Sequence, residues 1–158
     1  MSAANNLIPE SAAPAIVNTR VFPVPVAELF AAFRDPVRLA CWWGPAGFTN
    51  TIQEFDLRVG GAWRITMRAP NGTEFTNESR FLEVAPPNRL VFEHLGPMHR
   101  YWMTMEFAPA EAGARLTWRM RFESVGEYER LKDFIATANE QNFDRLAASL
   151  SGTEPPAR

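Results

Sequence analysis

The feature that most constrains this chain is a series of strand-like segments that ends in one long helical segment. Alternating apolar residues rich in aromatic and β-branched types predict the strands. Turn-forming residues such as Gly60-Gly61 and Pro86-Pro87-Asn88 separate most of them. The predicted strands cover residues 15–22, 48–58, 62–68, 74–84, 89–94, 99–107 and 114–122. This order predicts an α+β domain built on one curved antiparallel sheet of about seven strands.

Three helices complete the prediction. Residues 26–33 have the apolar spacing of a helix, and Asp35-Pro36 is typical of an N-cap followed by proline at the first helical position. A second short helix is therefore expected over 37–42. Residues 125–150 read as one long C-terminal helix, which alone is large enough to cover the apolar face of the sheet. A curved sheet packed across one helix leaves a cavity between the two.

The apolar pattern also predicts how the last hairpins pair. On the inner face, we expect Phe92 opposite Tyr101, His94 opposite His99, and Met103 opposite Trp118. On the outer face, the same registers give a favourable ionic pair and a favourable cation–π pair. These pairs join Glu106 to Arg115 and Trp102 to Arg119.

Strand 74–84 needs a bulge. Phe75, Asn77 and Ser79 share one parity along the chain, whereas Leu82 and Val84 have the other. An extra residue near Ser79-Arg80 would put all five on the inner face.

Composition is that of one compact domain. The chain has 158 residues, 46% of them hydrophobic and 22% charged. We expect a single domain over 15–150 between flexible ends at 1–14 and 151–158. The net charge of −2 argues against nucleic acid and membrane partners, whose binding rests on clustered positive charge.

The single cysteine, Cys41, excludes an intramolecular disulfide and a cysteine-rich zinc site, and we interpret it as buried. No apolar run reaches the ~20 residues that span a bilayer. The first ten residues lack the basic and apolar regions of a signal peptide. We therefore expect a cytoplasmic protein, and the sequence leaves the possibility of a homodimer open.

Several local motifs occur in the order found in one known family. They are Pro25–Phe30 (PVAELF), Trp42–Pro45 (WWGP), Asp56–Gly61 (DLRVGG), Phe81–Pro87 (FLEVAPP) and Asp144–Leu146 (DRL). Together they resemble homologues of the activator of the heat-shock-protein-90 ATPase. That family belongs to the START-like (SRPBCC) superfamily, which includes birch-pollen-allergen-type proteins and polyketide cyclases. The resemblance implies the helix-grip fold, with a hydrophobic cavity between the sheet and the last helix.

The chain departs from the family pattern at two places. Ala138-Asn139 stand where the family often has Gly-Trp, and Ser79 replaces a usual glycine. We expect both positions to lie near the helix–sheet groove, so the cavity shape and its ligand can differ from those of relatives.

Aromatic and methionine side chains on the predicted inner face could bind a flat apolar ligand, because methionine adapts to irregular shapes. A few polar groups would orient such a ligand. The candidate ligand-binding residues are Trp42, Trp43, Trp63, Met67, Asn77, Phe92, His94, Tyr101, Met103, Trp118, Met120, Ile135 and Asn139. The alternative for each aromatic residue is ordinary core packing, and Asn139 could equally be satisfied locally.

His94 and His99 are the only histidines. A neighbouring pair could bind a metal or act as an acid and a base, but two histidines without a third ligand make a poor zinc site. A solvated hairpin end is the simpler interpretation. We therefore expect no catalytic residue, no metal and no cofactor, and we interpret Asp56–Arg58 before Gly60-Gly61 as a structural turn.

Three functional hypotheses follow. The leading one is binding of a small apolar or aromatic molecule for sequestration, transport or sensing, without covalent chemistry. The second, implied only by the family resemblance, is a chaperone-associated role in the stress response, as an activator of a heat-shock-protein-90-type ATPase. The third is a polyketide-cyclase-like enzyme in which His94, His99 or an asparagine of the groove moves protons.

Overall fold

The computed structural model describes residues 7–152, which form seven strands and three helices. The remaining parts of the two ends predicted to be flexible, 1–6 and 153–158, lie outside the described residues. The elements are β1 (Ile16–Phe22), α1 (Val26–Arg34), α2 (Pro36–Trp42), β2 (Thr49–Phe55), β3 (Ala62–Arg68), β4 (Glu74–Ala85), β5 (Arg89–Gly96), β6 (Tyr101–Ala110), β7 (Gly113–Phe122) and α3 (Val125–Ser151). The predicted α+β fold is confirmed.

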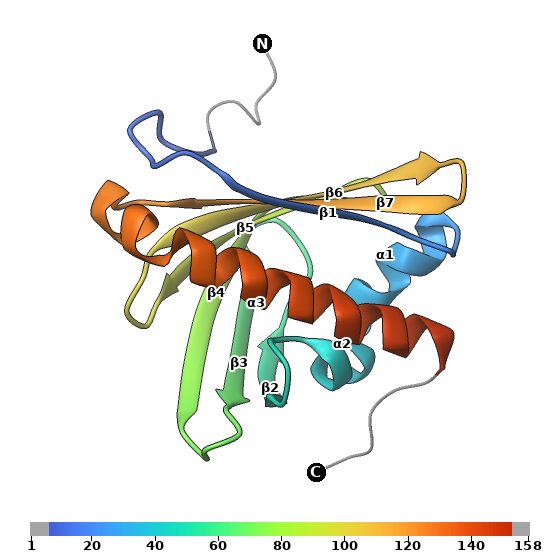
Figure 1. Ribbon diagram of the computed structural model, residues 1–158, viewed down its shortest axis with the longest axis horizontal. Coiled ribbons are helices and arrows are strands. Elements are labelled where there is room, and N and C mark those ends of the chain that lie inside the picture. The colour runs from blue at the N-terminus through green and yellow to red at the C-terminus, as the bar shows by residue number, and fades with distance from the viewer. Residues whose placement is uncertain (1–6, 153–158) are drawn as a thin grey trace.

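One sheet contains all seven strands, in the order β1-β7-β6-β5-β4-β3-β2, and every neighbouring pair is antiparallel. The sheet curves, and α3 crosses its concave face while α1 and α2 lie toward one end of that helix (Figure 1). In the described part of the chain, no helix is both long and apolar enough to cross a lipid bilayer.

Local capping explains where the helices begin and end. The Asp35 carboxylate accepts a hydrogen bond of 2.9 Å from the Val37 N–H, and Pro36 occupies the first turn of α2, as predicted. The Ser124 hydroxyl accepts a 3.1 Å bond from the Glu127 N–H at the start of α3. Gly152, with φ of 79°, ends α3 in the left-handed conformation that favours glycine.

The predicted hairpin registers are wrong by two residues. Phe92 lies opposite Met103, and His94 lies opposite Tyr101 instead of His99. The reason is that β5 continues to Gly96 before the chain turns, so β6 begins only at Tyr101. The β6–β7 register is displaced in the same way. A shift of two residues keeps each side chain on its face, so the assignment of inner and outer residues survives the error.

Because of this shift, the outer face has different partners from those predicted. Glu106 pairs with Arg119 at 3.3 Å and with Arg89 at 2.8 Å, instead of with Arg115. Arg100, and not Arg119, places its guanidinium over Trp102, with the guanidinium carbon 4.9 Å from the centroid of the indole ring. Trp102 is only 2% exposed. The Arg100 guanidinium therefore lies over a buried aromatic ring on the face of the sheet away from α3.

Strand β4 contains one bulge, but at Leu82 and not near Ser79-Arg80 as predicted: Phe81 and Glu83 pair with the adjacent residues Phe92 and Val91, so Leu82 is the extra residue. A second register shift, between Glu78 and Ser79, has its extra residue on β5 instead. Because β4 has no extra residue near Ser79-Arg80, Phe81 stays on the same face as Ser79 and lies in the core, whereas the prediction placed Leu82 there.

Two further details bear on the predictions. Cys41 is exposed and not buried, and its thiol lies 3.4 Å from the Val37 carbonyl oxygen.

The DLRVGG segment is a tight turn in which a Cβ atom on Gly61 would lie 1.9 Å from the Asp56 carbonyl oxygen. Only glycine fits such a close backbone approach, which supports the structural interpretation of this motif.

Candidate functional site

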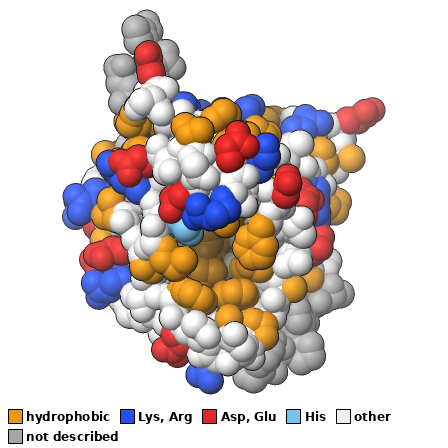
Figure 2. All heavy atoms as spheres, turned by 60° about the vertical axis from the view of Figure 1, so that its left-hand side comes forward, with side chains coloured by type: hydrophobic (Ala, Val, Ile, Leu, Met, Phe, Trp, Pro, Cys, Tyr) orange, Lys and Arg blue, Asp and Glu red, His pale blue; other side chains and the backbone are white. Residues whose placement is uncertain are grey.

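A cavity of about 200 Å³ lies between the concave face of the sheet and α3. A second cavity of about 230 Å³ adjoins it beneath the β5–β6 connection, and the two share Asn77, His94 and Tyr101 in their walls. Figure 2 shows a hollow bordered by hydrophobic side chains, with an imidazole at its edge. An engineered apolar cavity of about 150 Å³ is enough to bind benzene, so the first cavity alone has room for an aromatic molecule.

Of the thirteen predicted ligand-binding residues, all but Trp42 line the first cavity. Trp42 is buried behind it, with its ring 4.8 Å from that of Phe33 and its indole N–H donating to the Ala32 carbonyl at 3.2 Å. Seven further lining residues are not among the thirteen, namely Gly44, Pro45, Ile65, Ser79, Phe134, Ala138 and Asn142. Of these, Ser79 and Ala138 were expected near the groove because they depart from the family pattern. Asn142 could have been found from helical spacing, because it lies one turn after Ala138 on the same helix face.

Three tryptophans form the most aromatic part of the wall. The Trp43 ring centroid lies 5.0 Å from that of Trp63 and 5.5 Å from that of Trp118. Trp63 also contacts Phe92 at 5.3 Å. Trp43 therefore bridges β3 and β7, which are not adjacent in the sheet, and closes this side of the cavity.

The position of Trp43 depends on α3. The Arg145 guanidinium donates to the carbonyl oxygens of Trp43, Gly44 and Pro45 at 2.8, 3.1 and 3.0 Å, and to that of Cys41 at 3.0 Å. The amide of Asn142 donates to the Trp42 carbonyl at 3.0 Å. The WWGP and DRL motifs, about a hundred residues apart in the chain, are thus joined by direct hydrogen bonds.

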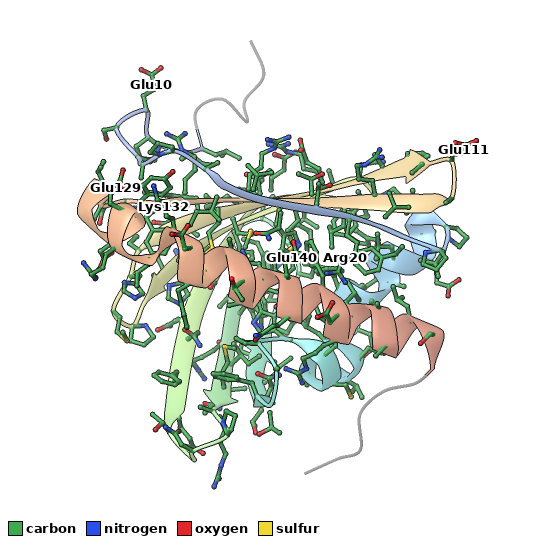
Figure 3. The ribbon with its side chains drawn as sticks, in the orientation of Figure 1. Glu10, Arg20, Glu111, Glu129, Lys132 and Glu140 are labelled. Carbon is green, nitrogen blue, oxygen red and sulfur yellow. The ribbon has the colours of Figure 1, made fainter. Side chains whose placement is uncertain are left out.

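A second contact fixes the middle of α3 to β1. Arg20 forms ion pairs with Glu140 at 2.7 Å and with Asp144 at 2.8 Å, and the sticks in Figure 3 show Arg20 and Glu140 beside each other. The Asn18 amide donates to Glu140 at 2.8 Å, and Asn139 donates to the Asn18 side-chain oxygen at 3.1 Å. Asn139 therefore lines the cavity while its amide group is used in the link between helix and sheet.

His94 is buried, with 5% of its surface exposed, and its ring stacks on Tyr101 at 4.5 Å. Its Nδ1 lies 2.8 Å from the His99 carbonyl oxygen, so that nitrogen carries a hydrogen and donates it. Burial lowers the pKa of His94 and favours the neutral ring, whereas the His99 backbone contact acts in the opposite direction.

The other ring nitrogen of His94, Nε2, lies 2.8 Å from the Asn77 side-chain oxygen. Only a protonated imidazolium can donate at both nitrogens. In the neutral form Nε2 accepts, so the Asn77 amide must turn its nitrogen toward the ring. The protonation of His94 and the orientation of Asn77 at the cavity wall are therefore coupled.

The prediction that the two histidine side chains form a solvated hairpin end is wrong. The His99 side chain instead lies with its Nδ1 2.9 Å from a Glu127 carboxylate oxygen, which ties the β5–β6 connection to the first turn of α3. Across residues 7–152 there is no group of three or more His, Cys, Asp or Glu side chains positioned to hold a metal ion.

The cavity wall is uncharged apart from any charge on its histidines. Neither cavity has an Asp, Glu, Lys or Arg among its described lining residues. Burial raises the pKa of Tyr101, which keeps its phenol neutral. An ion is costly to place in such a site, because no opposite charge there replaces its hydration.

Both departures from the family pattern lie where the resemblance implied. Ser79, Ala138 and Asn139 all line the first cavity. Small or polar side chains therefore stand on opposite walls, on β4 and on α3.

Solved structures with the same fold come from several bacteria. A crystal structure of a protein from Chromobacterium violaceum is 28% identical, covers 90% of this chain and 99% of its own, and has a TM-score of 0.72. A protein from Rhodobacter sphaeroides is 23% identical, covers 92% and 97%, and has a TM-score of 0.80. A protein from Nitrosomonas europaea is 22% identical, covers 93% and 99%, and has a TM-score of 0.79.

No curated protein matches the sequence significantly. The family model described as "Activator of Hsp90 ATPase homolog 1-like protein" matches residues 23–151, which include α1, α2, α3 and all strands except β1. The chain therefore belongs to the family of activator of Hsp90 ATPase homolog 1-like proteins, within the START-like fold.

Proposed function

We propose that the protein binds a small, uncharged apolar or aromatic molecule between its sheet and α3, and acts by sequestration, transport or sensing without covalent chemistry. The observation that carries this proposal is the cavity of about 200 Å³ walled by tryptophan, phenylalanine, methionine and tyrosine side chains. A few polar groups in a mostly apolar pocket are the usual design of a small-molecule site.

The expected affinity follows from the size of such a ligand. An aromatic group as large as a tryptophan side chain buries roughly 200 Å². At about 25 cal/mol per Å², this burial contributes about 5 kcal/mol, from which the cost of immobilising the ligand is subtracted. Apolar contacts alone thus support weak binding, so a tight ligand needs polar contacts or must also fill the adjoining cavity.

Access to the cavity is most easily explained by movement of the first half of α3. The buried residues of this helix, Asn142, Phe143, Leu146 and Ser149, all lie in its second half. The first half contributes Phe134 and Ile135 to the cavity wall, and 70% of Phe134 is exposed. A segment with few buried contacts opens at low free-energy cost.

A cavity-filling variant tests the proposal. Ala138→Trp puts a large ring into the cavity from α3, whereas the matched variant Thr137→Trp adds the same ring at the neighbouring exposed position. The probe is N-phenyl-1-naphthylamine, a neutral dye that fluoresces in apolar sites. We expect saturable binding to the wild type and Thr137→Trp, and at least tenfold weaker binding to Ala138→Trp. Equal binding by all three proteins would refute the location.

A chaperone-associated role is the second candidate, and the family description favours it. This role predicts a faster ATP turnover of a heat-shock-protein-90-type ATPase from the same host when the protein is added. An unchanged turnover at saturating protein would count against it, whatever the dye experiment shows.

A further inference from the structure

Two polar atoms in the tryptophan wall have no partner. Among the described residues, the buried side-chain nitrogen and oxygen atoms without a hydrogen-bond partner are Asn50 Oδ1 and the indole Nε1 atoms of Trp63 and Trp118. Both tryptophans line the same cavity and are only 4% and 1% exposed. Buried donors are nearly always paired in native proteins, and each unpaired one carries a desolvation penalty.

The fold explains why neither N–H finds an acceptor in the protein. Trp63 on β3 and Trp118 on β7 point inward from strands whose backbone groups are used within the sheet. The nearest aromatic ring is that of Trp43 for Trp63 and that of Phe143 for Trp118, and neither ring offers a strong acceptor. By contrast, the Trp42 indole N–H, outside the cavity, is paired with the Ala32 carbonyl.

We infer that the ligand of this cavity is an uncharged aromatic carbonyl compound, whose oxygen accepts a hydrogen bond from the indole N–H of Trp63, Trp118 or both. This inference rests on the proposed function and narrows it to a chemical class. Indole N–H groups only donate, so the complementary ligand atom must be an acceptor. The absence of cationic side chains from the described cavity walls selects a neutral carbonyl over a carboxylate, which would be buried without a counter-charge.

A matched pair of probes tests this assignment. 1-Indanone and indane share the same bicyclic skeleton and differ only in one carbonyl group. Dissociation constants for both are measured by NMR titration of the ¹⁵N-labelled protein, in which the five tryptophans give separate indole N–H signals. The preference for the ketone is the ratio of the two constants. This ratio is compared between the wild type and each variant. The different hydration of the two free probes contributes equally to every ratio, so it drops out of the comparison.

We expect 1-indanone to move the indole N–H signal of Trp63 or Trp118 downfield, because hydrogen bonding shifts an N–H proton in that direction. Indane, which has no acceptor, should not shift either signal downfield. In Trp63→Phe and Trp118→Phe, which keep an aromatic ring but remove the donor, the preference for the ketone should fall, by about three- to tenfold for the N–H that is used. Trp102→Phe, on the outer face, is the matched control and should keep the wild-type preference.

The outcomes separate the inference from the proposed function. If both probes bind in the cavity with no downfield indole shift and the same preference in every variant, the carbonyl assignment is wrong while the proposed function stands. If neither probe nor the neutral dye binds, both are refuted. The downfield shift is read on the wild type, so the inference remains testable even if a tryptophan variant fails to fold.

Discussion

Arg145 provides the sharpest test of how this cavity is held together. Its guanidinium donates to four backbone carbonyl oxygens of the segment that carries Trp43, at 2.8 to 3.1 Å. Replacement by methionine keeps much of the apolar length of the side chain but removes every donor. Hydrogen bonds from a charged group contribute about 1.5–3 kcal/mol each, although bonds from one group are not additive.

We therefore expect Arg145→Met to lower the free energy of unfolding by about 3 kcal/mol, which is worth roughly 6–12 °C in Tm for a domain of this size. The matched control is Arg58→Met in the DLRVGG motif. The Arg58 side chain is 77% exposed and, among residues 7–152, forms an ion pair only with Asp56. An exposed ion pair contributes about 0–1 kcal/mol, so this variant should stay close to the wild type.

The assay is urea unfolding followed by circular dichroism, combined with amide hydrogen exchange. Besides the lower stability, exchange should accelerate in 41–48 and in the second half of α3, because these two segments lose their direct connection. Equal stability losses in Arg145→Met and Arg58→Met, or faster exchange confined to α3, would refute the reasoning that Arg145 positions the tryptophan wall.

Three other expectations follow from the same contacts. Leu146→Ala, at a fully buried position of α3, should cost about 2–5 kcal/mol in chemical unfolding, and a cost under 1 kcal/mol would contradict the packing described. Burial lowers the folded-state pKa of His94 below 6.5, so the unfolded chain binds this proton more tightly than the folded protein does. The free energy of unfolding is therefore highest above about pH 6.5, and this contribution is lost as the pH falls through the folded-state pKa. Urea titrations from pH 7.5 to 5 should show this loss in the wild type and a smaller one in His94→Gln, and parallel curves would exclude the effect. Glu140→Gln should cost about 1 kcal/mol, because its ion pair with Arg20 is partly exposed, and a double-mutant cycle with Arg20→Met should show coupling between the two sites.

The period of two along the strands is what made the inner face predictable. Phe92, Met103 and Trp118 were assigned to the cavity side from alternation alone, and the structure confirms that face. The register was missed because the pattern of a strand does not determine how far it continues before the chain turns. Because β5 is two residues longer than predicted, each of its residues pairs with a β6 residue two positions further along, while each side chain stays on the predicted face of the sheet.

Contacts that join distant segments could not be read from the sequence. The link between Asn18 and Asn139 connects two elements more than a hundred residues apart, and no local pattern signals it. His94 was named both as a candidate ligand-binding residue and as part of a solvated hairpin end, because the hairpin was placed two residues early. In the structure it is enclosed by Tyr101, Asn77 and the backbone of His99. Arg145 was noted only as part of a family motif, and its role depends on carbonyl groups that the sequence does not orient.

The central claim is that the space between the sheet and α3 holds a small uncharged molecule, and native mass spectrometry tests it most directly. The protein is purified from its own host, weighed under native conditions, and weighed again after mild denaturation, beside the variant Ala138→Trp prepared in the same way. The account predicts a reproducible small molecule that leaves the wild type on unfolding and is reduced or missing in the variant. The same molecule in equal amounts on both proteins would contradict it.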